Sequence, residues 1–168
     1  MAGPRQVKAQ VKAKANEASL KGARILVVEA RYYEAIADTL LAGVRRALEE
    51  IGASFDVVTV PGALEIPTAL AIALDAAAAK RKSYDGAVAL GCVIRGDTIH
   101  FEIVSEQSAR GLMDVSIARK IPIGNAILTV NNEDQAKVRA SLDQGDKGGE
   151  AARAALTLVR LKRAVAKR

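Results

Sequence analysis

Short apolar runs rich in β-branched residues recur four times along the chain, each followed by a segment with helical periodicity. The four runs span residues 24–30, 54–60, 86–94 and 121–130. Their nearly continuous apolar character predicts strands that are buried on both faces, as in a parallel sheet. Because strand and helix patterns alternate, the sequence predicts an open parallel α/β sheet of four strands.

The segments between and after these runs carry helix signals. Over residues 34–51, apolar side chains repeat at steps of three or four, and Gly52 stands where a helix stop is expected. Pro67 is compatible with a second helix because proline is tolerated in a first turn. The predicted helices cover residues 34–51, 64–79, 101–119 and about 147–162, with one more after Asn131 or Asn132 as a cap.

The net charge of +6 belongs to the ends of the chain. Residues 1–24 carry six Lys/Arg and one Glu, residues 151–168 carry six Lys/Arg and no acid, and residues 25–150 have a net charge of −5. Residues 1–20 are polar and Ala/Lys-rich, so we predict a flexible basic N-terminal tail ahead of a single domain over residues 21–168. Tails that aid solubility are the favoured interpretation, and non-specific binding to polyanions is the alternative.

Composition also excludes several classes of protein. No apolar run approaches the roughly eighteen residues that span a membrane, and the N-terminus lacks the apolar region of a secretory signal. A single cysteine, Cys92, excludes an internal disulfide, and one cysteine with one histidine argues against a zinc site within one chain. With no tryptophan and few aromatic residues, no base-stacking platform is evident. We therefore expect a cytoplasmic protein with no metal, no membrane partner and no specific nucleic-acid partner.

The ends of the four predicted strands are where a ligand is expected. In open parallel α/β sheets, ligands bind beyond the carboxyl ends of the strands. The strand-end segments are "EARYY" (29–33), "VPGALE" (60–65), "IRGDTIH" (94–100) and "TVNN" (129–132).

The segment "IRGDTIH" contains the one histidine of the chain, His100. Gly96 permits a tight turn, and Thr98 is a predicted N-cap for the following helix, whose free N–H groups could bind a phosphate. The positive end of the helix dipole disfavours imidazolium, so we expect a neutral His100 that can act as a base. The alternative is a histidine that only caps or packs.

Charged residues elsewhere offer weaker candidates. Glu65 could accept hydrogen bonds from substrate hydroxyls, or it could be an ordinary acid in a helix first turn. Arg139 ends a short predicted helix and Lys147 opens the next, and both types of side chain suit phosphate binding. Glu150 is within helical reach of Lys147, so a solvent-exposed ion pair is the alternative for these two.

Five segments in order carry a resemblance to one family. They are "VVEARYY" (27–33), "VPGALEIP" (60–67), "YDGAVALGCVIRGDTIHFEIVSEQSARGL" (84–112), "ILT" (127–129) and "DKGGEAARAAL" (146–156). Together they resemble 6,7-dimethyl-8-ribityllumazine synthases, transferases that catalyse the penultimate step of riboflavin biosynthesis. The resemblance covers residues 22 to 162, nearly the whole chain apart from the tails.

The resemblance implies a flavodoxin-like, three-layer α/β/α fold with a four-stranded parallel sheet. It implies that 5-amino-6-(D-ribitylamino)uracil condenses with 3,4-dihydroxy-2-butanone 4-phosphate, without an organic cofactor or metal, to give the lumazine and phosphate. It also implies a homopentamer with sites between subunits, an icosahedral assembly in some members, and riboflavin synthase as a candidate partner. A flavin- or lumazine-binding protein with little or no turnover on the same scaffold is the alternative.

Residue roles carry over position by position. His100 matches the proton-transfer residue. The phosphate-binding positions are Gly96, Asp97, Thr98 and, from the adjacent subunit, Arg139. The substrate-binding positions are Tyr32, Ala63, Leu64, Glu65, Val93, Ile94, Asn125, Lys147 and Glu150. Tyr32 stands where the family usually has Phe, and Leu64 where many members have an aromatic residue, but no departure removes a charged or proton-transferring group.

Overall fold

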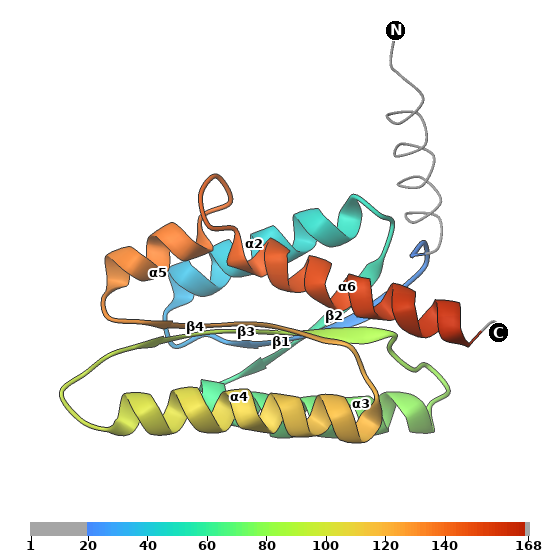
Figure 1. Ribbon diagram of the computed structural model, residues 1–168, viewed down its shortest axis with the longest axis horizontal. Coiled ribbons are helices and arrows are strands. Elements are labelled where there is room, and N and C mark those ends of the chain that lie inside the picture. Colours follow the sequence, from blue (N-terminus) through green and yellow to red (C-terminus); the bar gives the residue numbers. More distant parts are fainter. Residues whose placement is uncertain (1–19, 167–168) are drawn as a thin grey trace, which may run out of the picture.

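The computed structural model describes residues 20–166 and contains one parallel sheet flanked by helices (Figure 1). The elements are β1 (Arg24–Ala30), α2 (Glu34–Glu49), β2 (Ser54–Val60), the 3₁₀ turn η1 (Ala63–Glu65), α3 (Ile66–Ala79), β3 (Gly86–Ile94), α4 (His100–Arg119), β4 (Ile123–Val130), α5 (Glu133–Ala140) and α6 (Lys147–Val165). The four predicted strands are all present, each at or within two residues of its expected bounds.

The strands are all parallel, in the order β2-β1-β3-β4. At the centre of β1, Val27 pairs with Val57 of β2 and with Val88 of β3. β1 is almost entirely buried and β3 is buried up to Gly91, as predicted. The expectation of two-sided burial is wrong for β2 and β4, where exposed and covered residues are interspersed. These are the edge strands, and each has a neighbouring strand on one side only, so its margin faces solvent.

Helices cover both faces of the sheet. Figure 1 shows α2, α5 and α6 on one face and α3 and α4 on the other. Because successive side chains of a strand point to opposite faces, Val27 packs in the core under α2 and α6. Its neighbour Val28 packs in the second core, with Leu70 of α3 and Val104 of α4. The result is the predicted flavodoxin-like, three-layer α/β/α arrangement.

Local signals explain most helix boundaries. Gly52 follows α2 with φ 68°, the left-handed conformation that glycine adopts readily, and its N–H donates to the carbonyl of Glu49 at 3.1 Å. Asn132 caps α5 by accepting a hydrogen bond from the backbone N of Gln135 at 2.9 Å. The helix expected over residues 64–79 instead begins at Ile66, because residues 63–65 form the separate turn η1.

The start of α4 differs from the prediction by one residue. Ile99, rather than Thr98, occupies the N-cap position. The Thr98 hydroxyl still accepts a long hydrogen bond, 3.4 Å, from the backbone N of His100. The predicted N-cap is therefore displaced by one residue, and Thr98 keeps only this contact with the first N–H of the helix.

The expected N-terminal tail, residues 1–20, lies outside the described residues except for its last member. Leu20 is 5% exposed and packs in the core under α2 and α6, so it belongs to the packed chain. Within residues 20–166, no helix is both long and apolar enough to cross a membrane.

Candidate functional site

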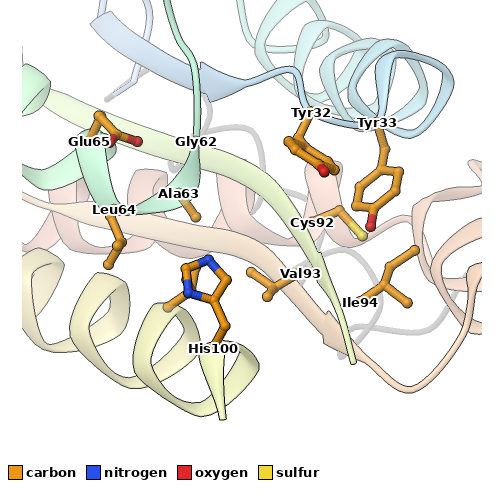
Figure 2. A pocket seen from close by; sticks show the side chains of 11 residues that line it. Tyr32, Tyr33, Gly62, Ala63, Leu64, Glu65, Cys92, Val93, Ile94 and His100 are labelled. Atoms are coloured by element: carbon orange, nitrogen blue, oxygen red, sulfur yellow. The ribbon is translucent and has the colours of Figure 1, made fainter. Parts of the chain in front are cut away.

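A pocket of about 370 Å³ opens at the carboxyl ends of β1, β2 and β3 (Figure 2). The residues that line it are Tyr32, Tyr33, Gly62, Ala63, Leu64, Glu65, Cys92, Val93, Ile94, His100 and Val104. This is the edge of the sheet at which a ligand is expected in an open parallel fold. The pocket therefore brings together seven of the predicted site residues, from four different segments of the chain.

The loop after β1 supplies an aromatic wall. Tyr32 is 76% exposed, and its ring meets that of Tyr33 edge to face with centroids 5.0 Å apart. Tyr33 is partly buried against the core, and this burial raises the pKa of its phenol, which is neutral at physiological pH. Tyr32 thus presents a ring that is free of core contacts and is backed by an uncharged neighbour.

The turn after β2 supplies a second wall. Gly62 has an extended backbone, φ −148°, and η1 follows directly. A Cβ at position 62 would lie 2.9 Å from Oε2 of Glu65, so the glycine leaves room for that carboxylate. Ala63 is buried, whereas Leu64 and Glu65 are exposed, and Figure 2 shows all three beside the pocket. An apolar and an acidic side chain are therefore available on one turn.

The floor of the pocket is the end of β3, which extends beyond its pairing with β1. The pairing of β1 with β3 ends at Leu90, whereas the pairing of β3 with β4 continues to Ile94. The last residues of β3, from Cys92 onward, are consequently half-buried. Burial raises the pKa of the Cys92 thiol to about 11, so the thiol is neutral at physiological pH.

His100 reaches the pocket from the opposite layer. It is the first residue of α4, and Val104 lines the pocket one helical turn later. Figure 2 shows the imidazole across the pocket from the aromatic wall. Within residues 20–166, no group of three or more His, Cys, Asp or Glu side chains could hold a metal ion. The arrangement places an imidazole beside apolar and aromatic surfaces.

The predicted phosphate turn, residues 96–98, is separated from His100 by Ile99 and is exposed, but it is not part of the pocket lining. Gly96 does not adopt the left-handed backbone, and an added Cβ there would meet nothing within 4 Å. The backbone at position 96 is therefore one that other residues can also adopt. Arg95 is directed elsewhere: its guanidinium lies 4.2 Å from the centre of the Phe101 ring and pairs with Glu102.

Comparison with known proteins identifies the family. The family model for 6,7-dimethyl-8-ribityllumazine synthase matches residues 22–163. The chain belongs to this family. A lumazine synthase of Rhodopseudomonas palustris strain BisA53 is 56% identical over 167 residues, 99% of both chains. The enzyme of Nitrobacter hamburgensis is 61% identical over 88% of this chain and 91% of its own. The enzyme of Azorhizobium caulinodans is 63% identical over 84% and 88%.

Besides the phosphate turn, four further positions marked by the lumazine synthase resemblance do not line this pocket. Asn125 is the third residue of β4 and is exposed, and its Oδ1 accepts the backbone N–H of Ile127 at 2.9 Å. Arg139 is exposed near the end of α5 and donates to the carbonyl of Gln135 at 3.4 Å.

The other two of these positions lie in the first turn of α6. Lys147 and Glu150 form the ion pair that their spacing predicts. Both side chains are largely open to solvent, with exposed fractions of 43% and 57%. In a single chain, the pair therefore has the character of a surface ion pair.

Sequence reasoning missed four of the residues that line the lumazine synthase pocket: Tyr33, Gly62, Cys92 and Val104. Tyr33 and Gly62 lie inside the strand-end segments, so the rule that located those segments could have included them. Cys92 precedes such a segment by two residues. Val104 follows His100 by four residues, which places both on the same face of a helix.

Proposed function

We propose that this chain is an active lumazine synthase, a transferase. It condenses 5-amino-6-(D-ribitylamino)uracil with 3,4-dihydroxy-2-butanone 4-phosphate to give 6,7-dimethyl-8-ribityllumazine and phosphate. The observation that carries the proposal is the pocket, in which His100 lies together with Tyr32 and the turn η1 in a chain that matches the family over residues 22–163. The relatives at 56% to 63% identity carry the same enzyme name.

The pyrimidine substrate fits the side of the pocket formed by the first two strand ends. The exposed Tyr32 ring offers a face for stacking on the heterocycle. On the neighbouring turn, the Glu65 carboxylate can accept hydrogen bonds from ribityl hydroxyls, and Leu64 offers apolar contact. Val93 and Ile94 would line the base of this substrate site.

The phosphate substrate fits the approach to α4. The first N–H groups of a helix have no intrahelical partner, and its N-terminus attracts anions. The turn of Gly96, Asp97 and Thr98 lies at this helix start, and the space beside Gly96 is open within the chain. A guanidinium from Arg139 of an adjacent subunit would complete the anion site with a bidentate donor.

His100 is the residue that we propose to move protons. An amine of the pyrimidine forms a C–N bond with the carbonyl carbon of the butanone, and water leaves to give an imine. Elimination then breaks the C–O bond to phosphate, the second amine closes the ring, and a second water leaves. Each step needs a proton delivered or removed and none transfers electrons to an external acceptor. A positioned imidazole suits proton transfer near neutral pH.

We further propose a homopentamer whose sites lie at subunit interfaces, with an icosahedral shell of such rings as a possible larger assembly. Asn125, Arg139, Lys147 and Glu150 lie outside the pocket of their own chain, which supports a site completed by the neighbour. We place the enzyme in the cytoplasm, with riboflavin synthase as a candidate partner that consumes the product. Sedimentation velocity or light scattering would distinguish five, ten and sixty subunits.

The decisive experiment supplies both substrates to the purified protein and follows the lumazine absorbance together with phosphate release. The two products are expected to appear in a 1:1 ratio, and omission of either substrate abolishes both. Folded, assembled protein that binds lumazine or flavin tightly but releases no phosphate would instead identify the non-catalytic binding protein.

A further inference from the structure

A buried carboxylate lies behind the pocket, at the end of β1. Glu29 is 3% exposed. The Thr59 hydroxyl donates a hydrogen bond to its Oε1 at 3.0 Å, and Nη1 of Arg31 lies 3.3 and 3.4 Å from its two oxygens. Nη2 of Arg31 also donates to Oδ1 of Asp38 in α2 at 2.6 Å. The four side chains join the ends of β1 and β2 to the start of α2.

The position of this network matters because the two loops that form walls of the pocket follow it directly in the chain. Glu29 and Thr59 are opposite each other in the β1–β2 register, one residue before the end of each strand. Three residues after Glu29 comes Tyr32, and three residues after Thr59 comes Gly62. A single carboxylate thus links the strand end that precedes the aromatic wall to the strand end that precedes the turn ending at Glu65.

An ionisable group is an expensive choice for this position. Glu29 points to the sheet face on which Val27 packs, and an apolar side chain there would avoid the cost of desolvating a charge. The carboxylate supplies directional contacts, because charge-assisted hydrogen bonds fix the relative placement of the groups that they join. Arg31 adjoins Tyr32, whose own side chain is 76% exposed, so the Arg31 ion pairs hold this part of the loop on one side, and the core contacts of Tyr33 hold it on the other.

We propose that Glu29 is a positioning residue that sets the spacing between Tyr32 and the turn of residues 62–65, and thereby the affinity for the pyrimidine substrate. The proposal rests on the proposed function. Glu29 does not itself line the pocket. The phosphate turn follows β3, and none of the hydrogen bonds of Glu29 reaches it. Loss of the network should therefore affect one substrate more than the other.

The test compares Glu29→Gln, which keeps the shape and removes the charge, with Thr59→Val, which removes one donor. For Glu29→Gln we expect the KM for 5-amino-6-(D-ribitylamino)uracil to rise about tenfold, while the KM for the butanone phosphate changes less than about twofold. Thr59→Val should show a smaller change with the same selectivity. If Glu29→Gln does not fold, Thr59→Val alone carries the test.

Asp56→Asn is the matched control. Asp56 accepts hydrogen bonds from Nη2 of Arg24 at 3.0 Å and from the Tyr84 hydroxyl at 2.7 Å, near the amino ends of the strands. Its loss removes a carboxylate that also pairs with an arginine and a hydroxyl, but in a more exposed network away from the pocket, so neither KM should change. Equal increases in both KM values, or unchanged kinetics in a folded Glu29→Gln variant, would overturn the proposal.

Failure of the proposed function has a different signature, because the wild-type protein would then show no turnover. In that case the Kd of 6,7-dimethyl-8-ribityllumazine, measured by fluorescence titration, replaces the KM. A roughly tenfold weaker Kd for Glu29→Gln, with Asp56→Asn unchanged, supports the positioning role without catalysis. Equal Kd values, or no lumazine binding by the wild-type protein, overturns it.

Discussion

The imidazole of His100 stands at the first position of α4 and is exposed, so its removal takes away a proton carrier and little packing. For His100→Ala we expect kcat to fall by about 10²–10⁴-fold, the usual contribution of a general acid–base. The free energy of unfolding should change by less than about 0.5 kcal/mol. Single-turnover lumazine formation and thermal melting measure the two effects. Gln107→Ala, an exposed change on the same helix, is the control, and unchanged turnover in His100→Ala would remove the proton-transfer role.

Cys92 offers a prediction about reactivity at the pocket floor. Burial raises the pKa of its thiol to about 11, so at neutral pH its thiolate fraction is roughly 300-fold below that of an ordinary thiol with a pKa of about 8.5. Because raising the pH deprotonates more of the thiol, the rate of alkylation by iodoacetamide should still be rising at pH 10. Mass spectrometry follows the reaction, with glutathione as the reference. A rate that levels off near pH 8.5 would contradict the burial of this thiol.

Local pattern located the segments that carry the site, but it did not reveal how residues pair across strands. The apolar runs ended where the strands end, and the carboxyl-end rule then pointed to Tyr32, Glu65 and His100. The partnership of Glu29 with Thr59 depends on the register of β1 against β2, and no short motif encodes it. Such pairs become visible only when the sheet is assembled.

Among the elements, α6 is joined to α2 by one buried carboxylate at the start of α6. Asp146 accepts hydrogen bonds from Nη2 of Arg46 at 3.0 Å, from Nη2 of Arg153 at 2.9 Å and from the backbone N of Gly149 at 3.3 Å. Burial alone would raise the pKa of Asp146, but the hydrogen bonds and the charges of the two arginines together outweigh it, and the pKa lies below its ordinary value. The carboxylate therefore ties the start of α6 to α2.

Asp146→Asn should lower the free energy of unfolding by about 1–3 kcal/mol at pH 7, since it removes both charged pairs. A pKa depressed in the folded state stabilises the fold above the unfolded-state value, about 3.9, and this contribution is lost as the pH falls through the folded-state value. The difference between wild type and Asp146→Asn should thus be full at pH 7 and shrink below about pH 4. Urea unfolding at several pH values measures it, and a gap that widens in acid would refute this sign.

Helices and strands were predictable where the spacing of apolar residues within the segment itself determines which of its faces is buried. The 3.6-residue period over 34–51 matched α2, and Gly52 marked its end. The prediction of two-sided burial was wrong for β2 and β4 because an apolar run in the sequence does not tell whether a strand is central or at an edge of the sheet. The delayed start of α3 at Ile66 reflects a 3₁₀ turn whose sequence is compatible with either helix type.

At the scale of the whole molecule, the strand order β2-β1-β3-β4 decides which loops meet. The order of the strands along the chain does not specify their order in the sheet. The order in the sheet places the ends of β1 and β3 side by side and β4 at one edge. Asn125 on β4 and Arg139 on α5 consequently lie away from the pocket lining of their own chain. Sequence resemblance identified these positions, but a single chain does not bring them to His100.

This separation predicts complementation between two inactive variants. If His100 of one subunit works with Arg139 of its neighbour, His100→Ala and Arg139→Ala homo-oligomers should each be nearly inactive. Random co-assembly of the two variants should restore about one quarter of the interfaces to a complete site, because each such site needs one intact residue from each variant. Co-expression with two affinity tags isolates the mixed oligomers, and phosphate release measures their activity. Separately purified variants mixed without subunit exchange are the control. A site contained in one chain would recover no activity, because every subunit would carry one of the two substitutions.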